Sequence, residues 1–155
     1  MTFVLSLCDR TGNMVRPWLD AGIRCVTLDM QDSPDIHPLR EHIVMDVRTC
    51  HIGFDLPAIV FGFPPCTHLA SSGARWFRDK GLGKLIEALQ IVEAVRSICD
   101  ASGAPYAIEN PVGTLATYWR DPDYQFHPVH YSGWSPEPAA DEYTKKTCLW
   151  TGGAS

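Results

Sequence analysis

Short apolar runs alternate with longer polar or amphipathic segments through the first two thirds of the chain. Five of the runs have the length of buried strands, and polar residues bound each of them. They span residues 3–7, 24–28, 42–45, 58–61 and 106–108. Because strands that alternate with helices favour a largely parallel sheet with helices on both faces, the pattern predicts an α/β fold of the Rossmann-like type.

Two of the intervening segments have the patterns of helices. Asn13 can cap a helix that runs to residue 21, and Gly22 can close it. Residues 82–99 carry apolar side chains at helical spacing, and Gly103 lies just beyond them. Weaker patterns near the C-terminus predict strands at residues 126–131 and 147–150. Residues 132–142 between them are predicted to form a loop.

The composition is that of an ordinary globular protein. With 155 residues, of which 45% are hydrophobic and 20% charged, the chain can bury one core, and we expect residues 1–155 to form a single domain. No apolar run approaches the roughly 20 residues of a membrane span, and the N-terminus does not resemble a signal peptide, so we expect a cytoplasmic protein. Its six cysteines form no CxxC pair, which favours reduced thiols and no metal site.

The net charge of −5 argues against broad, non-specific binding of polyanions, because affinity for nucleic acid rests largely on neutralising phosphates. Two local groups of cations remain, and each is either a solvated surface or a phosphate contact. They are Arg75, Arg78, Lys80 and Lys84 in one group, and Lys145 and Lys146 in the other.

Chemically useful side chains follow five of the predicted strands. Taken singly, an aspartate at the end of a strand is usually a turn former or a helix cap. In a parallel sheet, however, the ligand lies outside the carboxyl ends of the strands, so we expect these side chains to share one site. They are Asp9, Asp29, Asp46, Cys66 and Glu109.

The first predicted strand leads into a turn with a glycine and then a helix, over residues 8–13. Such a turn brings backbone N–H groups against a nucleotide-like ligand, although Gly12 alone is a weak signal. Asp29 follows about 20 residues later and can accept hydrogen bonds from a ribose diol. Asp46 can accept from an adenine amino group. Together these features predict a cofactor that contains adenosine.

Cys66 and Glu109 form the second chemical pair. The preceding prolines, Pro64 and Pro65, fix the backbone that carries the thiol, and residues 71–83 have the glycine content of a mobile flap. A thiolate can add to a pyrimidine ring while a carboxylic acid supports the charge that collects on the ring nitrogen. The simpler interpretations are a small buried hydrophobic residue for Cys66 and a buried ion pair for Glu109.

These residues resemble the DNA cytosine-C5 methyltransferases, and the short phage-type members above all. Ser6 to Asn13 occupy the place of the glycine-rich first loop of that family. The Pro-Cys dipeptide of its nucleophile loop falls on Pro65-Cys66, and its Glu-Asn-Val motif becomes Glu109-Asn110-Pro111. The later Ser-x-Ala-Gly, Asp-x-Arg-Gly and Gln-x-Arg-x-Arg elements are echoed loosely by residues 71–73, 79–81 and 145–147.

The resemblance implies a methyltransferase that uses S-adenosylmethionine, methylates cytosine in DNA and works in a bacterial or phage-infected cytoplasm. It assigns catalysis to Cys66 and Glu109. It assigns the cofactor to Asp9, Thr11, Gly12, Asn13, Asp29, Asp46 and Pro64. It assigns contacts with the substrate to Pro65, Asn110, Arg75 and Lys146.

Family members usually carry a target-recognition domain after the catalytic half, and 155 residues leave no room for one. We therefore expect a separate recognition subunit or a homo-oligomer if DNA is the substrate. Three alternatives stay open. The first is C5 modification of a free cytosine nucleotide, for which a folate is a second candidate cofactor. The second is a silent module that binds a nucleotide, S-adenosylmethionine or a protein partner, and the third is a cysteine hydrolase. His68 shows no partner in the sequence that would support the hydrolase.

Overall fold

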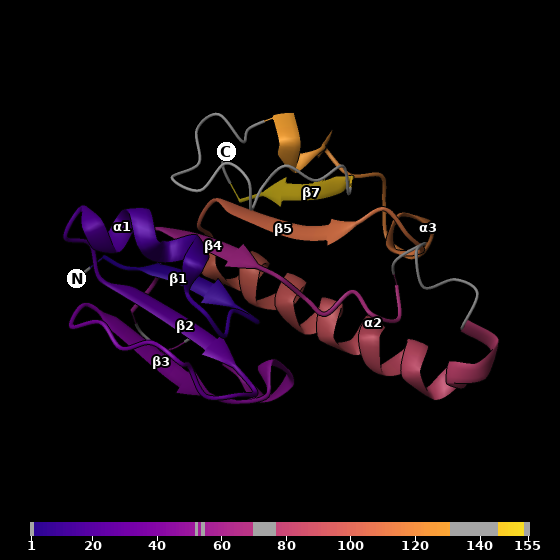
Figure 1. The fold of residues 1–155 in the computed structure, drawn as a ribbon, viewed down its shortest axis with the longest axis horizontal. Coiled ribbons are helices and arrows are strands. Elements are labelled where there is room, and N and C mark those ends of the chain that lie inside the picture. Colours follow the sequence, from indigo (N-terminus) through magenta and orange to yellow (C-terminus); the bar gives the residue numbers. More distant parts are fainter. Residues whose placement is uncertain (1, 52, 54, 70–76, 131–145, 154–155) are drawn as a thin grey trace.

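The computed structural model describes residues 2–51, 53, 55–69, 77–130 and 146–153. Seven strands of this part of the chain form one sheet in the order β3-β2-β1-β4-β5-β7-β6 (Figure 1). β1 to β5 pair in parallel, whereas β7 lies antiparallel between β5 and β6. The strands are β1 (Val4–Leu7), β2 (Cys25–Asp29), β3 (Arg40–Val44), β4 (Ile59–Gly62), β5 (Tyr106–Pro111), β6 (Tyr124–Phe126) and β7 (Thr147–Gly152).

The long helix α2 packs on one face of the sheet and the short helix α1 on the other (Figure 1). The helical elements are η1 (Asn13–Val15), α1 (Arg16–Asp20), η2 (Val47–Thr49), α2 (Phe77–Ser102) and α3 (Leu115–Tyr118), where η marks a 3-10 helix. The predicted α/β fold is therefore confirmed, with thinner helical cover than expected. In the described chain, residues 30–39 between β2 and β3 hold no helix.

Alternation along the strands divides the apolar side chains between two cores. On β1, Leu5 and Leu7 face α2, while Val4 faces α1. Each fully buried residue of this size contributes about 1.5–3 kcal/mol relative to leaving it exposed. The smaller core closes with Trp18 of α1, whose ring centroid lies 5.1 Å from that of Phe61 on β4. Both faces of the central strands are thereby dry, as a parallel sheet requires.

Three local predictions were wrong in detail. Gly12 rather than Asn13 is the N-cap of η1, because its left-handed φ of 72° makes the turn there. The strand predicted at 126–131 lies at Tyr124–Phe126, and residues 128–130 form a 3-10 turn. Residues 77–83 of the expected flap belong to α2, which changes direction at Gly81 with φ 75°. The rest of the flap and the loop predicted at 132–142 lie outside the described residues.

None of the described helices combines the length and the apolar character that crossing a membrane would need. The longest of them, α2, carries charged residues along its exposed side, such as Glu87, Glu93 and Arg96. Its apolar residues face the sheet, as in a helix that covers the core of a domain.

Gly62 at the end of β4 sets how closely α2 approaches the sheet. A Cβ atom added at Gly62 would lie 2.5 Å from Cγ1 of Val95, which is fully buried and stiff at χ1. We expect Gly62→Ala to lower the free energy of unfolding by about 1–3 kcal/mol through overpacking. Chemical denaturation measures this change. Gly83→Ala is the control, because nothing lies within 4 Å of its added Cβ, and Gly62→Ala with Val95→Ala should recover part of the loss.

Candidate active site

The carboxyl ends of the parallel strands meet at one edge of the sheet, where their arrowheads point in Figure 1. Cys8 and Asp9 follow β1, Asp29 ends β2, and Asp46 lies two residues beyond β3. The Cys66 loop, which comprises residues 63–69, follows β4. Glu109 lies within β5. The structure thus brings the predicted strand-end residues to the same side of the molecule.

Asp9 organises the first loop. Its Oδ2 atom accepts a hydrogen bond from the Ser6 hydroxyl at 2.8 Å, and its Oδ1 atom accepts from the Gly12 backbone N–H at 2.8 Å. The residue is only 7% exposed. Asp9 therefore fixes the turn that Gly12 makes, and both of its carboxylate oxygens already have donors within the protein.

Arg40 of β3 supports the same turn from beneath. An added Cβ at Gly12 would lie 2.5 Å from the Arg40 guanidinium carbon and would displace that group, and the φ of 72° also favours glycine. Arg40 donates to the Arg10 carbonyl at 3.0 Å and to the Thr27 hydroxyl at 3.0 Å. The loop that follows β1 is therefore held by a carboxylate on one side and a guanidinium on the other.

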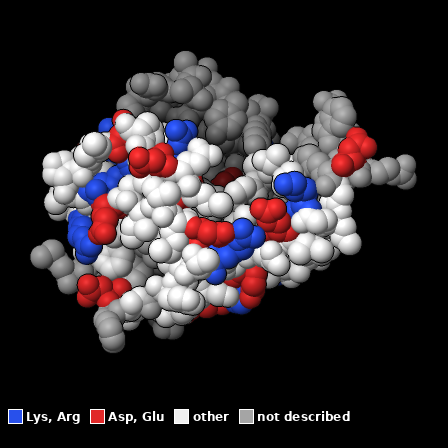
Figure 2. Space-filling model, turned by 90° about the horizontal axis from the view of Figure 1, so that it is seen from below, with Lys and Arg blue, Asp and Glu red and all other residues white. Residues whose placement is uncertain are grey.

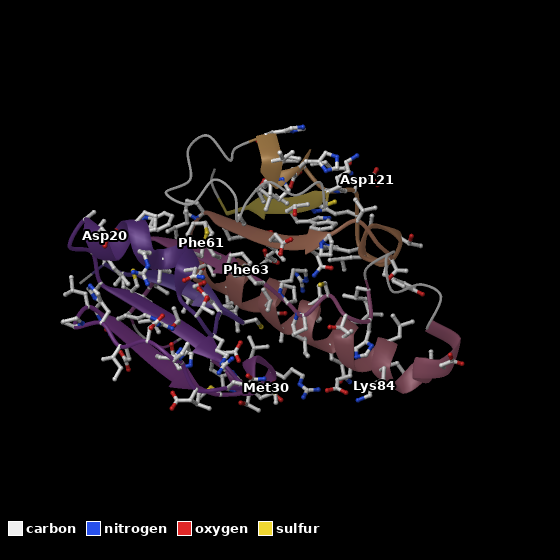
Figure 3. All side chains as sticks on the ribbon, in the orientation of Figure 1. Asp20, Met30, Phe61, Phe63, Lys84 and Asp121 are labelled. Carbon is white, nitrogen blue, oxygen red and sulfur yellow. The ribbon has the colours of Figure 1, made fainter. Side chains whose placement is uncertain are left out.

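A cavity of about 220 Å³ opens at the ends of β1, β2 and β3. Two of the residues predicted to bind the cofactor, Asp29 and Asp46, lie in its wall, as does Pro65 of the cysteine loop. The other residues that line it are Cys8, Leu28, Met30, Gln31, Met45, Val47 and Ile91. Met30 lies at the arrowhead end of β2, far from Asp20 of α1 (Figure 3).

The remaining predicted cofactor residues lie around this cavity rather than in its wall. Thr11 and Gly12 line a separate cavity of about 200 Å³, shared with Arg40. Asn13 is exposed, and its backbone N–H donates to the Thr11 hydroxyl at 3.3 Å. Pro64 is buried beneath the cysteine loop.

The two cavity carboxylates differ in their partners. Asp29 accepts from the Gln31 backbone N–H at 2.8 Å, which shapes the turn after β2. Asp46 caps η2 and pairs with Arg48 at 2.7 Å, and the hydrogen bonds from Arg48 hold the pKa of Asp46 below its usual value. Asp46 therefore stays ionised at neutral pH and keeps its negative charge at the mouth of the cavity.

Cys8 lines the cavity, although the sequence indicated no role for its side chain. Its φ of 56° is the one left-handed value of a non-glycine residue in the described chain, and such a conformation often marks a functional turn. Burial, together with the charges of Asp29 and Asp46, raises the pKa of Cys8 to about 12. The thiol is therefore neutral and forms part of the apolar wall. Met30, Met45 and Ile91 were not identified as site residues from the sequence either, because an apolar residue outside a periodic strand carries no pattern that marks it as part of a cavity.

The Cys66 loop is attached to β5. In the parallel register of β4 with β5, Gly62 pairs with Ile108, so Phe63 and Glu109 follow side by side. One residue further, the Asn110 side chain donates from Nδ2 to the Pro64 carbonyl at 3.0 Å. Cys66 and Glu109 are both half-buried. The predicted catalytic pair thus lies on two adjacent strand ends.

Strand alternation puts Glu109 and Asn110 on opposite faces of the sheet. Glu109 shares the α1 face with Phe61 and Phe63, which lie close together over the middle of the sheet in Figure 3. Asn110 faces the α2 side and is 1% exposed. Of this pair, only Glu109 is partly exposed to solvent.

Lys146 lies beside this edge of the sheet and Arg75 outside the described residues. The exposed Lys146 directly precedes β7, and its carbonyl accepts from the Val112 N–H at 3.4 Å. Burial raises the pKa of the Cys148 thiol, and the positive charge of Lys146 offsets part of that rise. Of the predicted substrate cations, Lys146 alone can be located.

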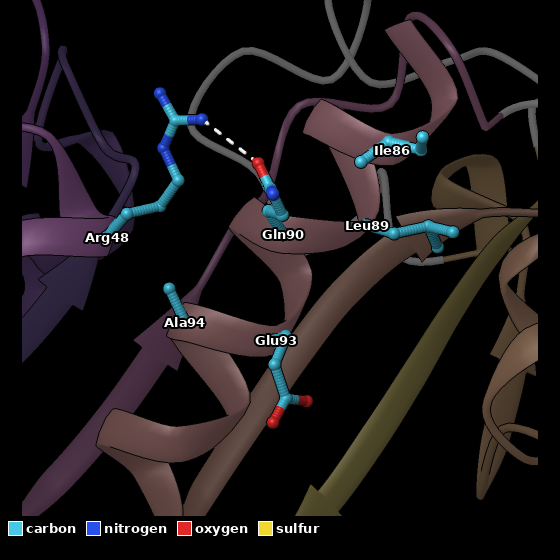
Figure 4. A pocket seen from close by; sticks show the side chains of 6 residues that line it. All are labelled: Arg48, Ile86, Leu89, Gln90, Glu93 and Ala94. Carbon is cyan, nitrogen blue, oxygen red and sulfur yellow. Dashed lines mark hydrogen bonds between the residues drawn. The ribbon is translucent and has the colours of Figure 1, made fainter. Parts of the chain in front are cut away.

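A second groove, of about 650 Å³, runs between η2 and α2 (Figure 4). Arg48 spans it and donates to Gln90 Oε1 at 3.5 Å. Charges of both signs are interspersed over this face in Figure 2. Several of them are paired, as Arg96 is with Glu93 and Asp100. The described part of this face therefore offers mixed charge rather than a continuous basic surface for phosphates.

No protein-family model and no curated protein matches this sequence. Solved structures do match. A candidate S-adenosylmethionine-dependent methyltransferase from Listeria monocytogenes is 9% identical, with a TM-score of 0.55 over 97% of this chain and 89% of its own. A DhpI–SAH complex is 17% identical over 73% of this chain, with a TM-score of 0.41. The CcbJ methyltransferase from Streptomyces caelestis is 14% identical over 79% of this chain, with a TM-score of 0.43.

The chain spans about half the length of the last two proteins, 50% and 47% respectively. Among these three structures, the Listeria protein covers nearly the whole chain, and at 9% identity this likeness concerns the fold. In the described chain, five parallel strands are joined at β5 by the antiparallel β7. The chain therefore has a Rossmann-like α/β fold similar to that of the Listeria protein.

Proposed function

We propose that this protein transfers a methyl group from S-adenosylmethionine to carbon 5 of cytosine, with Cys66 as the nucleophile. One observation carries the proposal: a single loop borders both halves of the site. Pro65 lines the cavity that contains Asp29 and Asp46. The carbonyl of Pro64 accepts a hydrogen bond from the side chain of Asn110, the neighbour of Glu109. A methyl donor in the cavity and a base held by Cys66 and Glu109 would meet at this loop.

The residues of the cavity fit the adenosine part of the proposed cofactor. Asp29 ends β2, where a carboxylate can accept from a ribose diol, and Met30, Met45 and Ile91 offer apolar contact for a purine. At about 220 Å³ the cavity is smaller than the roughly 300–1,000 Å³ of typical ligand pockets, so it would hold part of the cofactor. Bound S-adenosylmethionine would supply the methyl group.

The chemistry on the base follows from the thiol and the acid. The Cys66 thiolate adds to carbon 6 of cytosine, and Glu109 stabilises the charge that develops at N3. This makes carbon 5 nucleophilic, and carbon 5 takes the methyl group. Loss of the proton from carbon 5 then breaks the bond between sulfur and carbon 6 and restores the ring. In duplex DNA the cytosine would first have to leave the stack.

Cys66 suits this role better than the other thiols. Burial raises the pKa of Cys99 to about 12, as burial and two carboxylates do for Cys8, so neither forms a thiolate near neutral pH. Cys25 is fully buried in the α1 core. Cys66 is half-buried, on a loop at the strand ends.

DNA is the first candidate for the substrate, and it would require a partner that recognises the target, either a separate subunit or a second copy. Lys146 and Arg75 are the cations that we propose for phosphate contacts. A free cytosine nucleotide is the second candidate, favoured by the net charge of −5 and the mixed charge of the face in Figure 2. A single phosphate needs one or two cations, whereas a duplex needs many.

We predict that wild-type protein binds S-adenosylmethionine or its demethylated product, and that Asp29→Ala weakens this binding by about 1.5–3 kcal/mol, the range for lost hydrogen bonds to a charged group. Isothermal titration calorimetry measures both. Asp121→Ala is the matched control, since the exposed Asp121 lies beyond α3 and far from Met30 of the cavity wall (Figure 3). Absence of heat with the wild type at millimolar ligand would exclude this cofactor.

We predict that 5-fluorocytosine traps Cys66 when S-adenosylmethionine is present, because fluorine at carbon 5 blocks the final elimination. Two probes separate the substrates: a duplex oligonucleotide that contains 5-fluorocytosine, and 5-fluorocytidine monophosphate. Peptide mass spectrometry should locate the adduct on Cys66 and find none in Cys66→Ala. An adduct on Cys8 or Cys148 would contradict the assignment, and cofactor binding without any adduct would indicate a silent module.

We predict that Glu109→Gln slows formation of the adduct about 10²–10⁴-fold, the usual contribution of a general acid. Its affinity for S-adenosylmethionine should stay close to that of the wild type, because Glu109 acts in the transition state for addition. The trapping rate and the calorimetric Kd give the two quantities. Equal losses in both would place Glu109 in the cofactor site instead.

A further inference from the structure

The Cys66 loop is fastened at two points to one neighbouring segment, residues 110–114. At its start, the Pro64 carbonyl accepts from Asn110 Nδ2 at 3.0 Å. At its end, the Leu69 carbonyl accepts from the Thr114 backbone N–H at 2.8 Å and from the Thr114 hydroxyl at 3.3 Å. Between these points the loop closes on itself, because the Leu69 N–H donates to the Cys66 carbonyl at 2.9 Å.

Both fastening points lie in the dry interior. Leu69 is fully buried in the α2 core and Asn110 is 1% exposed. Hydrogen bonds in such surroundings are strong and costly to leave unmade. The loop between them reaches the surface, with Cys66 half-buried and Thr67 exposed. The Cys66 loop is therefore held at its start by a buried hydrogen bond and at its end by hydrogen bonds from the half-buried Thr114.

The Asn110 side chain serves the loop and not a ligand. Its Oδ1 atom is inaccessible to solvent and has no hydrogen-bond partner among the described residues, so no substrate could reach it without rearrangement. Turning the amide round would set Oδ1 against the Pro64 carbonyl, two acceptors in contact. The native orientation is therefore fixed by the bond to Pro64.

We propose that Thr114 is a positioning residue, whose backbone N–H acts together with the Asn110 amide to set the place of Cys66 relative to Glu109. The acid and both fastening groups belong to one continuous segment, residues 109–114. The position of Cys66 therefore depends on two strands: β4, which it follows, and β5, which carries Glu109. The catalytic meaning of this placement rests on the function proposed above, whereas the fastening itself does not.

Thr114→Pro removes the N–H donor with little other change. Thr114 has φ −78°, which proline adopts, and its carbonyl still accepts from Thr117 and Tyr118 at the start of α3. Thr114→Ala is the matched control, because it keeps the N–H and removes only the weaker hydroxyl bond. The pair therefore separates the backbone bond from the side chain.

Two reactions of Cys66 should respond in opposite directions in Thr114→Pro. Alkylation by iodoacetamide, followed by peptide mass spectrometry, should speed up about tenfold at Cys66 alone, because the freed loop exposes the thiol. Cys25 and Cys99, both fully buried, should stay protected. Trapping by 5-fluorocytosine should slow about 10–100-fold, since a misplacement of about 1 Å costs rates of that order. Affinity for S-adenosylmethionine, and both reactions in Thr114→Ala, should stay within about twofold of the wild type.

Wild-type rates of both reactions in Thr114→Pro would overturn the proposal, as would equal changes in Thr114→Ala. If Cys25 and Cys99 also react in Thr114→Pro, the variant has unfolded. Hydrogen exchange of the wild-type protein then tests whether Thr114 fastens the loop. The Thr114 and Leu69 amides should then open together, and an unprotected Thr114 amide would refute the fastening. If the wild type forms no adduct yet alkylation of Cys66 still separates the two variants, the positioning role stands and the proposed function fails.

Discussion

The parallel register between β4 and β5 is the constraint on which the candidate site depends. Because Gly62 pairs with Ile108, the next residues of each strand meet in order: Phe63 beside Glu109, then Pro64 bonded to Asn110. A slip of one residue would turn every side chain of β5 to the other face. Glu109 would then point into the α2 core, and the amide that holds the cysteine loop would be lost to solvent.

The cavity at the ends of β1, β2 and β3 combines charged and apolar side chains. Asp29 and Asp46 both lie in its wall, and both have protein donors, from Gln31 and Arg48 respectively. The neighbouring Cys8 avoids repulsion by staying protonated, as its pKa near 12 indicates. The cavity thus combines two anionic acceptors with apolar walls, a combination suited to a nucleoside, which has hydroxyl and amino donors on a flat apolar ring.

The thin helical cover explains the surface around the site. Only the 3-10 helix η2 follows β3 in the described chain before β4, so one side of α2 stays open as the groove that Arg48 spans. Ion pairs such as that of Arg96 with Glu93 keep this side soluble without making it basic. The arrangement leaves the cavity that contains Asp29 and Asp46 close to the surface.

The sequence by itself determined the strands of the parallel sheet, because hydrophobic alternation and strand length are local properties. It also determined that acids and a thiol follow these strands, and thus share one edge of the sheet. Only the tertiary structure decided which of them face the same space. Asp9 turned inward to hold Gly12, Cys8 became part of the cavity wall, and Asn110 turned toward Pro64. These outcomes depend on register and on partners tens of residues away, such as Arg40 beneath Gly12 and Thr114 beside Leu69. No local pattern encodes such pairings, since each follows from how two strands or loops are packed against one another.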